Sequence, residues 1–276
     1  MSGGAVARGS VLLAALCAAS HLSAQVPQDL ERDRAEYAAW LRSAPTSPFA
    51  AIALQRIGPG LTIGPVGSDV LLPDASQFRV MASGGRITLD SGGVSRPLPR
   101  NRVVPLGGYR LLATGPTGRT TLLVFGTPRG VQAPEYFPHF RAAVETVTLT
   151  PPARRQSALL LAPDGTEADA DDAGSITVTA FGTPVLLRVR RFPGTSDDEA
   201  DLEIYFRDGT SGHGSYPAGR FVSLEPLGAG RYQIDFNRAR NPFCAYSSVY
   251  PCPAPWPGNT IAGKVEAGER YRGSAP

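Results

Sequence analysis

The fold is decided by a stretch of strict alternation, Leu202-Glu203-Ile204-Tyr205-Phe206-Arg207. Apolar side chains at every second position are typical of a strand that packs one face of a sheet and leaves the other face polar. The same period recurs in three other stretches, which contain Ile176 and Val178, then Val185, Leu187 and Val189, then Tyr232, Ile234 and Phe236. We therefore predict a mainly β protein with an antiparallel, sandwich-like architecture.

Shorter strands are expected earlier in the chain, at residues 62–63, 69–72, 78–81, 86–89, 109–113 and 120–125. Glycine-rich turns separate them, and the chain holds 31 glycines and 26 prolines among 276 residues. One helix precedes these strands. It is predicted from Asp29, as its cap, to about Arg42, with Leu30, Tyr37 and Leu41 on one face. Pro45 and Pro48 end it.

Residues 1–24 have the features of a secretory signal peptide: Arg8, an apolar run over 11–19, and small residues before a cleavage site after Ala24. We expect an exported protein, periplasmic or extracellular, with no membrane span once this segment is removed. Only Cys244 and Cys252 then remain, and a disulfide is expected between them. A metal site is not expected, because no histidine lies near this pair.

Four segments are predicted. Residues 1–24 are the signal peptide, 25–48 an N-terminal helical segment, 49–130 a first β lobe and 131–276 a second β lobe. No linker rich in serine and glycine separates the two lobes, so we expect them to pack closely.

Several functional classes find no support. The chain lacks a G-x-S-x-G elbow, an H-E-x-x-H string and the dinucleotide-binding glycine spacing, and we expect no cofactor. Without Arg8 the balance is 26 basic against 24 acidic residues, a net charge of +2, and the arginines are dispersed. A nucleic-acid partner is therefore not expected. Two acidic stretches, Asp164 to Asp172 and Asp197 to Glu199, are predicted to be solvated hairpin tips and not calcium loops.

Short polar side chains recur near predicted strand ends in the last third of the chain. The candidate ligand-binding residues are Asp208, Arg220, Asp235, Asn237, Arg238 and Asn241. Arg220 and Arg238 can meet Asp208 or Asp235. Two interpretations stay open: buried ion pairs that tie down a proline-rich tail, or the lining of a ligand cleft.

The same region contains a series of short strings: Gly219-Arg220-Phe221, Asp235 to Ala239, Asn241-Pro242, Cys244-Ala245, Cys252-Pro253 and Ala267-Gly268-Glu269. Together they resemble a bacterial family of unknown function, DUF1684. The resemblance extends upstream through residues 206–210 and 136–138 to the Trp40 helix. The family implies no activity. The chain departs from its pattern at Phe243, where a proline is usual, and at Arg240, where an aromatic is common. His213 stands at a variable position, which argues against a shared catalytic base there.

A weaker similarity lies in the first lobe. Ile63-Gly64 and Ser68 to Asp74 are similar to the opening strands of forkhead-associated domains. Those domains read phosphothreonine through an arginine and a Ser-x-x-His string. Here Pro65 stands in place of the arginine, and Arg79 follows Ser76 where the histidine is expected. The similarity therefore supports a β-sandwich and argues against phosphopeptide binding.

The function predicted from these observations is binding of a small ligand, an envelope component or another partner through the Asp/Asn/Arg cluster of the second lobe. One alternative is a hydrolase of envelope or extracellular material, with Asp208 or Asp235 as acid or base and arginines holding an anion. Another is a structural scaffold with an exposed apolar patch and no pocket.

Overall fold

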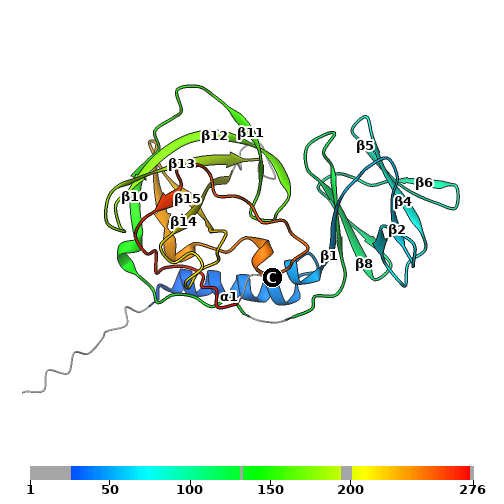
Figure 1. Ribbon diagram of the computed structural model, residues 1–276, viewed down its shortest axis with the longest axis horizontal. Helices are drawn as coiled ribbons and strands as arrows, with labels where there is room; N and C mark the ends of the chain where they lie inside the picture. Colours follow the sequence, from blue (N-terminus) through cyan, green and yellow to red (C-terminus); the bar gives the residue numbers. More distant parts are fainter. Residues whose placement is uncertain (1–25, 131–132, 194–200, 274–276) are drawn as a thin grey trace, which may run out of the picture.

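The computed structural model describes residues 26–130, 133–193 and 201–273. The predicted signal peptide and the acidic stretch from Asp197 to Glu199 lie outside these ranges. The described chain is mostly antiparallel sheet with one α-helix, as predicted, and it forms two groups of strands side by side (Figure 1).

Helix α1 runs from Gln28 to Ser43 and buries Leu30, Tyr37 and Leu41, the stripe that the spacing predicts. Asp29 is not its cap. The N-cap position is Pro27, which makes no side-chain hydrogen bond, and Asp29 lies in the first turn. There its negative charge suits the helix dipole and remains available to a partner outside the helix.

The first strand group consists of two sheets that face each other. One sheet has the order β1-β9-β8-β7 and the other β3-β2-β4-β5-β6. The space between them is filled by apolar side chains such as Ile63, Val80, Leu111, Leu122 and Val124. The strands are β1 (Ala51–Arg56), β2 (Leu61–Gly64), β3 (Val70–Leu71), β4 (Phe78–Ser83), β5 (Arg86–Ser91), β6 (Val94–Pro97), β7 (Val103–Leu106), β8 (Tyr109–Thr114) and β9 (Thr121–Phe125).

The second group is one curved sheet with the order β10-β16-β15-β14-β13-β12-β11, and β17 pairs in parallel with β14. Its strands are β10 (Val144–Thr148), β11 (Ser157–Leu161), β12 (Glu167–Val178), β13 (Val185–Phe192), β14 (Asp201–Asp208), β15 (Arg220–Gly228), β16 (Arg231–Asp235) and β17 (Thr260–Ile261). One face carries the larger core, with Ile204, Phe206, Ile234 and Phe236.

The opposite face of this sheet is only partly polar, which corrects the expectation from alternation. Tyr205 and Phe221 stack there at 4.2 Å between ring centroids and pack with Trp256 from the tail. The first acidic stretch also differs from the prediction, because Asp169, Asp171 and Asp172 lie within strand β12 and not at a hairpin tip. Parity predicts which side chains share a face, but it does not predict which distant segment covers that face.

The predicted disulfide is not present. Both Cys244, which is buried, and Cys252, which is exposed, are free thiols. The hydroxyl of Tyr216 donates to the carbonyl oxygen of Cys244 at 3.3 Å and hydrogen-bonds with the sulfur of Cys252 at 3.4 Å. The Tyr216 hydroxyl therefore contacts the backbone of Cys244 and the side chain of Cys252.

The two strand groups meet through an apolar cluster and an ion-pair fork. Ala50, Leu123 and Phe125 from the first group pack with Tyr216 and Tyr250 from the second. At the edge of this contact Glu167 of β12 accepts hydrogen bonds from Arg56 and Arg119. Within the described ranges, no helix is long and apolar enough to cross a membrane.

Candidate functional site

Asp208 and Arg220 form an ion pair sealed inside the second sheet. Their side chains are 0% exposed, and Arg220 Nη2 lies 2.9 Å from Asp208 Oδ2. The other carboxylate oxygen of Asp208 accepts hydrogen bonds from the backbone N–H groups of Thr210 and Val265. Both side chains are enclosed by the described residues, so Asp208 and Arg220 do not belong to the exposed part of the candidate cluster.

The tail completes the enclosure of Arg220. Its guanidinium donates to the carbonyl oxygens of Val265, Ala267 and Glu269. A buried charge is tolerated when it is paired and hydrogen-bonded, and of the Arg220 guanidinium nitrogens only Nε has no partner among the described residues. Arg220 therefore anchors residues 265–269 across the end of β14 and β15.

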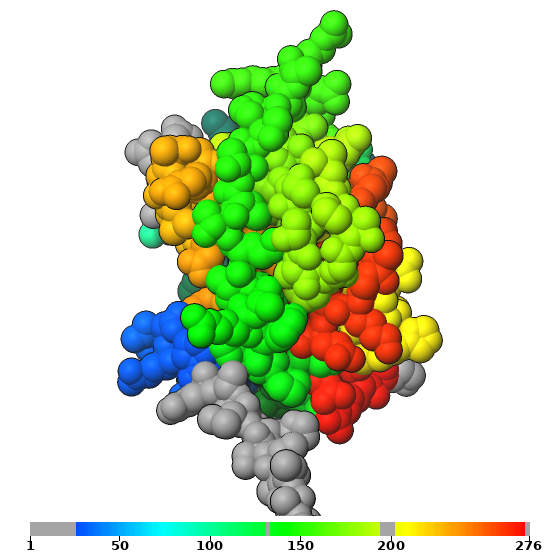
Figure 2. All heavy atoms as spheres, turned by 90° about the vertical axis from the view of Figure 1, so that its left-hand side faces the viewer, coloured from blue at the N-terminus to red at the C-terminus, as the bar shows by residue number. Residues whose placement is uncertain are grey.

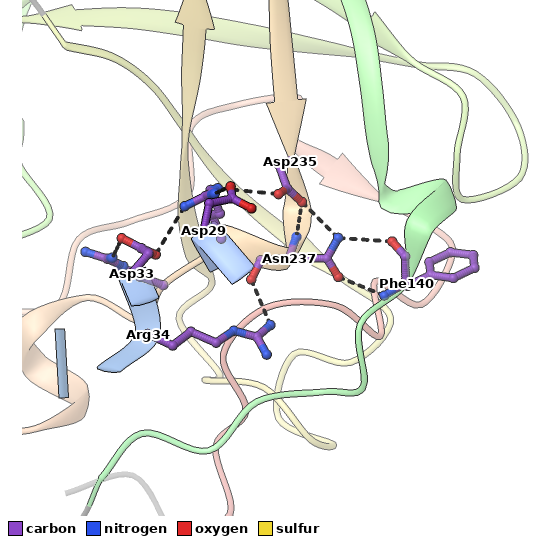
Figure 3. Close-up of polar contacts among 8 residues, drawn as sticks. Asp29, Asp33, Arg34, Phe140, Asp235 and Asn237 are labelled. Atoms are coloured by element: carbon purple, nitrogen blue, oxygen red, sulfur yellow. Dashed lines mark hydrogen bonds and ion pairs between the residues drawn. The ribbon is translucent and has the colours of Figure 1, made fainter. Parts of the chain in front are cut away.

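A second ion-pair cluster connects helix α1 to the end of β16 (Figure 3). Arg238, in the 3₁₀ turn Phe236–Arg238, pairs with Asp29 and with Asp33, and its Nε lies 3.5 Å from Asp235 Oδ2. Arg240 pairs with Asp33 at 2.8 Å. Unlike the first pair, these groups are partly exposed, with 32% of the Arg238 side chain and 14% of the Asp235 side chain accessible.

Asn237 belongs to this cluster but has a structural role. Strand β16 ends at Asp235, and the following turn buries the Asn237 side chain completely. Its amide accepts from the N–H of Phe140 at 2.9 Å and donates to the carbonyl of Phe140 at 3.0 Å (Figure 3). Arg34 of α1 donates to its carbonyl oxygen. Asn237 thus fixes the 140 segment and is not available to a ligand.

A groove of about 1050 Å³ opens between α1 and the face of β14–β16 that points away from the larger core. Three of the six candidate residues line it, namely Asp235, Arg238 and Asn241, whereas Asp208, Arg220 and Asn237 do not. Figure 2 shows α1, in blue, on the same side of the molecule as the orange β15–β16 hairpin. Of the three that line the groove, Asp235 and Arg238 are partly exposed, whereas Asn241 is buried.

The groove carries more negative than positive charge. Its six carboxylates belong to Asp29, Asp33, Glu36, Glu203, Glu225 and Asp235, against three arginines, Arg32, Arg238 and Arg240. Two of these arginines are already paired with carboxylates of the groove. Glu36 and Glu225 are exposed and have no ion-pair partner among the described residues. Aromatic side chains line the same groove, including Trp40, Phe221 and Phe243.

A smaller pocket, of about 230 Å³, lies near the C-terminal end of the described chain and shares Asn241 with the groove. Its wall includes Glu269, which is 1% exposed. The Glu269 carboxylate accepts hydrogen bonds from the N–H of Asn241 at 2.7 Å and from the hydroxyl of Tyr246. Burial raises the pKa of Glu269 to about 7, and these two hydrogen bonds only partly oppose the shift.

Glu269 is absent from the six candidates, although it stands in the Ala267-Gly268-Glu269 string that carries the family resemblance. Its position depends on Gly268, which has φ +75°. A Cβ there would lie 2.6 Å from the carbonyl oxygen of Phe236 and 2.7 Å from that of Ala239. In the sequence, the feature that could have pointed to Glu269 is the glycine directly before it in the family string.

Comparison with known proteins places this tail in a family. Residues 129–270 match the family described as "Protein of unknown function (DUF1684)". The chain belongs to the DUF1684 family. The match covers the second strand group, so the Trp40 helix and the first β lobe lie outside it, although the resemblance was expected to include the helix.

One solved structure is similar to this member of DUF1684. It is the solution NMR structure of an uncharacterised protein from gene locus rrnAC0354 of Haloarcula marismortui, 31% identical, with a TM-score of 0.43. The similarity covers 50% of this chain and 76% of that protein. The comparison with curated proteins gives no match.

The exposed part of this site offers a ligand carboxylates, guanidinium groups and aromatic faces. Among the described residues, no group of three or more His, Cys, Asp or Glu side chains could hold a metal ion. Asp208 is enclosed, so the hydrolase alternative loses one of its two candidate acids. Asp235 accepts two hydrogen bonds from Asn237, from its backbone N–H and from its side-chain amide. Those contacts orient Asp235 as part of a wall.

Proposed function

We propose that this DUF1684 protein is an exported binding protein that holds an extended, positively charged peptide in the groove between α1 and β14–β16. The observation that carries this proposal is the composition of the groove lining. Its carboxylates outnumber its arginines two to one, and those of Glu36 and Glu225 are unpaired among the described residues. A groove with complementary charge attracts and orients such a ligand.

Two other features support a peptide over a small ion. The volume of about 1050 Å³ lies at the upper end of small-molecule sites, and the groove runs along a helix and across three strands. Aromatic faces beside carboxylates suit the alkyl stems and charged heads of lysine and arginine side chains. Export rests on residues 1–24 alone, and N-terminal sequencing of the mature protein that starts at Gln25 would support it.

The proposal is tested by titrating the full mature chain with a tetralysine peptide, with tetraglutamate as the comparison ligand. Tetralysine should bind and tetraglutamate should not, and binding should weaken as salt is raised because the contacts are solvent-exposed. The double variant Glu36→Gln/Glu225→Gln should weaken binding by about threefold or more, since each exposed ion pair contributes less than about 1 kcal/mol.

Glu31→Gln is the matched control. Glu31 is an exposed carboxylate of α1 that does not line the groove, so its loss should leave tetralysine affinity nearly unchanged. If Glu31→Gln weakens binding as much as the double variant does, general attraction and not the groove is responsible. Absence of any salt-dependent tetralysine binding would also refute the proposed ligand class.

A further inference from the structure

The smaller pocket has features that the proposed groove function does not explain. It lies between Phe49, the 133–135 segment, the 3₁₀ turn Phe243–Ala245 with Tyr246, and tail residues 269–273. Two of its wall residues, Asn241 and Glu269, are polar and more than nine-tenths buried. Buried polar groups at a pocket wall require hydrogen-bond or ion-pair partners.

Glu269 is 1% exposed, and no arginine or lysine of the described residues lies within ion-pair distance of its carboxylate. Arg240 and Arg220 act on it only at longer range, and Arg270 and Arg272 line the same pocket. The Glu269 carboxylate is held only by the neutral donors Tyr246 Oη and the N–H of Asn241. An isolated carboxylate in such surroundings is unfavourable unless it is protonated or meets a cation.

The side-chain oxygen of Asn241 receives no hydrogen bond from the described residues. The backbone N–H and the Nδ2 of this residue are both used, the latter on the carbonyl oxygen of Arg270 at 3.2 Å. The unpartnered oxygen, Oδ1, is buried. Since the N–H of Asn241 binds Glu269 directly, the free amide oxygen and the carboxylate belong to the same wall of the pocket.

We propose that this pocket binds a small organic ammonium compound, whose N–H groups donate to the Glu269 carboxylate and to Asn241 Oδ1. The pocket volume of about 230 Å³ is below the usual range for larger ligands, which indicates a compound with few heavy atoms. Phe49, Tyr246 and Tyr271 line the same pocket and suit a short alkyl chain. Asn241 lines the groove as well, but the carboxylate that the proposal uses, Glu269, is not among those of the groove.

The titration of Glu269 gives the proposal a pH signature. Burial is the main cause of its raised pKa of about 7, and the groups that act on it are Tyr246, Asn241, Arg240 and Arg220. Tyr37 and Tyr136 also interact with it. An ammonium group favours the charged carboxylate, so its affinity should rise as pH increases through about 7 and its binding should release a proton.

The test uses n-propylammonium chloride as the probe, with n-propanol as the neutral isostere and sodium chloride as the salt control, in calorimetric titrations of the full mature chain at pH 8 and pH 6. Propylammonium stays charged at both values. It should bind at pH 8, several-fold more weakly at pH 6, and n-propanol should not compete. Glu269→Gln should reduce affinity at pH 8 by about tenfold or more, because it removes a charge-assisted hydrogen bond.

Glu266→Gln is the matched control, because Glu266 is an exposed carboxylate of the same tail that does not line the pocket. The affinity of this control variant for propylammonium should stay within about twofold of that of the native protein. Equal losses in the two variants, equal binding of n-propanol, or no binding of propylammonium would each overturn the proposal. If Glu269→Gln does not fold, as judged by circular dichroism, the comparison of pH 6 with pH 8 in the native protein decides the question.

Discussion

At the scale of the residue, Glu269 shows how one side chain can combine a structural and a chemical role. Gly268 lets the tail approach the 3₁₀ turn of residues 236–238 more closely than any side chain would permit, and Glu269 N–H then donates to Ala239. On folding, the Glu269 carboxylate loses its hydration and accepts hydrogen bonds from the Tyr246 hydroxyl and the Asn241 N–H. Its ionisation is therefore coupled to folding.

We expect the free energy of unfolding to fall as pH rises from about 4.5 to above 7. The folded pKa of Glu269, about 7, exceeds its ordinary value of 4.5, so its contribution is fully present below 4.5 and is lost as pH rises through about 7. The full span is on the order of 3 kcal/mol. Urea unfolding at a series of pH values measures it.

Two variants separate this effect from other titrations. Glu269→Gln should flatten the decline between pH 5 and 8, whereas Glu135→Gln, which removes an exposed carboxylate, should retain it. An unchanged pH slope in Glu269→Gln would mean that another group is responsible.

At the scale of the element, α1 is held by its buried apolar stripe and also by ion pairs from its exposed face. Asp29 and Asp33 pair with Arg238 and Arg240, and the Arg240 guanidinium lies 4.0 Å from the ring centroid of Tyr37. Tyr37 also hydrogen-bonds to Tyr246. Because α1 forms one wall of the groove, these contacts set the width of the groove.

Arg238→Ala should loosen the first turns of α1 and lower the free energy of unfolding by about 1 kcal/mol, since the lost pairs are partly exposed. Hydrogen exchange of residues 28–35 should accelerate, and the difference from the native protein should shrink in high salt. Arg42→Ala, in the last turn of the same helix, is the control because Arg42 is exposed and unpaired among the described residues. Similar exchange rates in both variants would argue against a role of the Arg238 ion pairs in holding the first turns of α1.

At the scale of the whole molecule, an apolar cluster and one acidic residue connect the two strand groups (Figure 1). Glu167 receives both Arg56 and Arg119, and the hydrogen bond from Arg119 is the main cause of its lowered pKa. The stabilisation that the Glu167 ion pairs contribute is therefore present at neutral pH and is lost as pH falls through the lowered pKa of Glu167. The cluster around Phe125 and Tyr216 does not titrate in this range.

Glu167→Gln should consequently lower stability at pH 7 by no more than about 1 kcal/mol and leave the lobes in contact. Small-angle scattering should give the same radius of gyration as the native protein, and urea unfolding should show the small shift. Asp74→Asn, an exposed change in the first lobe, is the control. A larger radius of gyration for Glu167→Gln would mean that the ion pairs of Glu167 with Arg56 and Arg119, and not the apolar cluster, hold the lobes together.

The sequence by itself determined the β class, most of the strands that alternate, the apolar stripe of α1 and the family tail, because these depend on local periodicity or on a motif. It also indicated that Arg220 and Arg238 can meet Asp208 or Asp235, but it left open which arginine pairs with which carboxylate. Only the tertiary structure decided that the pair of Asp208 with Arg220 is sealed and that the pair of Asp235 with Arg238 lines a groove. That outcome depends on segments far away in the chain: the tail around Val265 covers one pair, and α1, some 200 residues earlier, approaches the other without covering it. Periodicity fixes the face on which a side chain lies, whereas burial of that face depends on long-range packing.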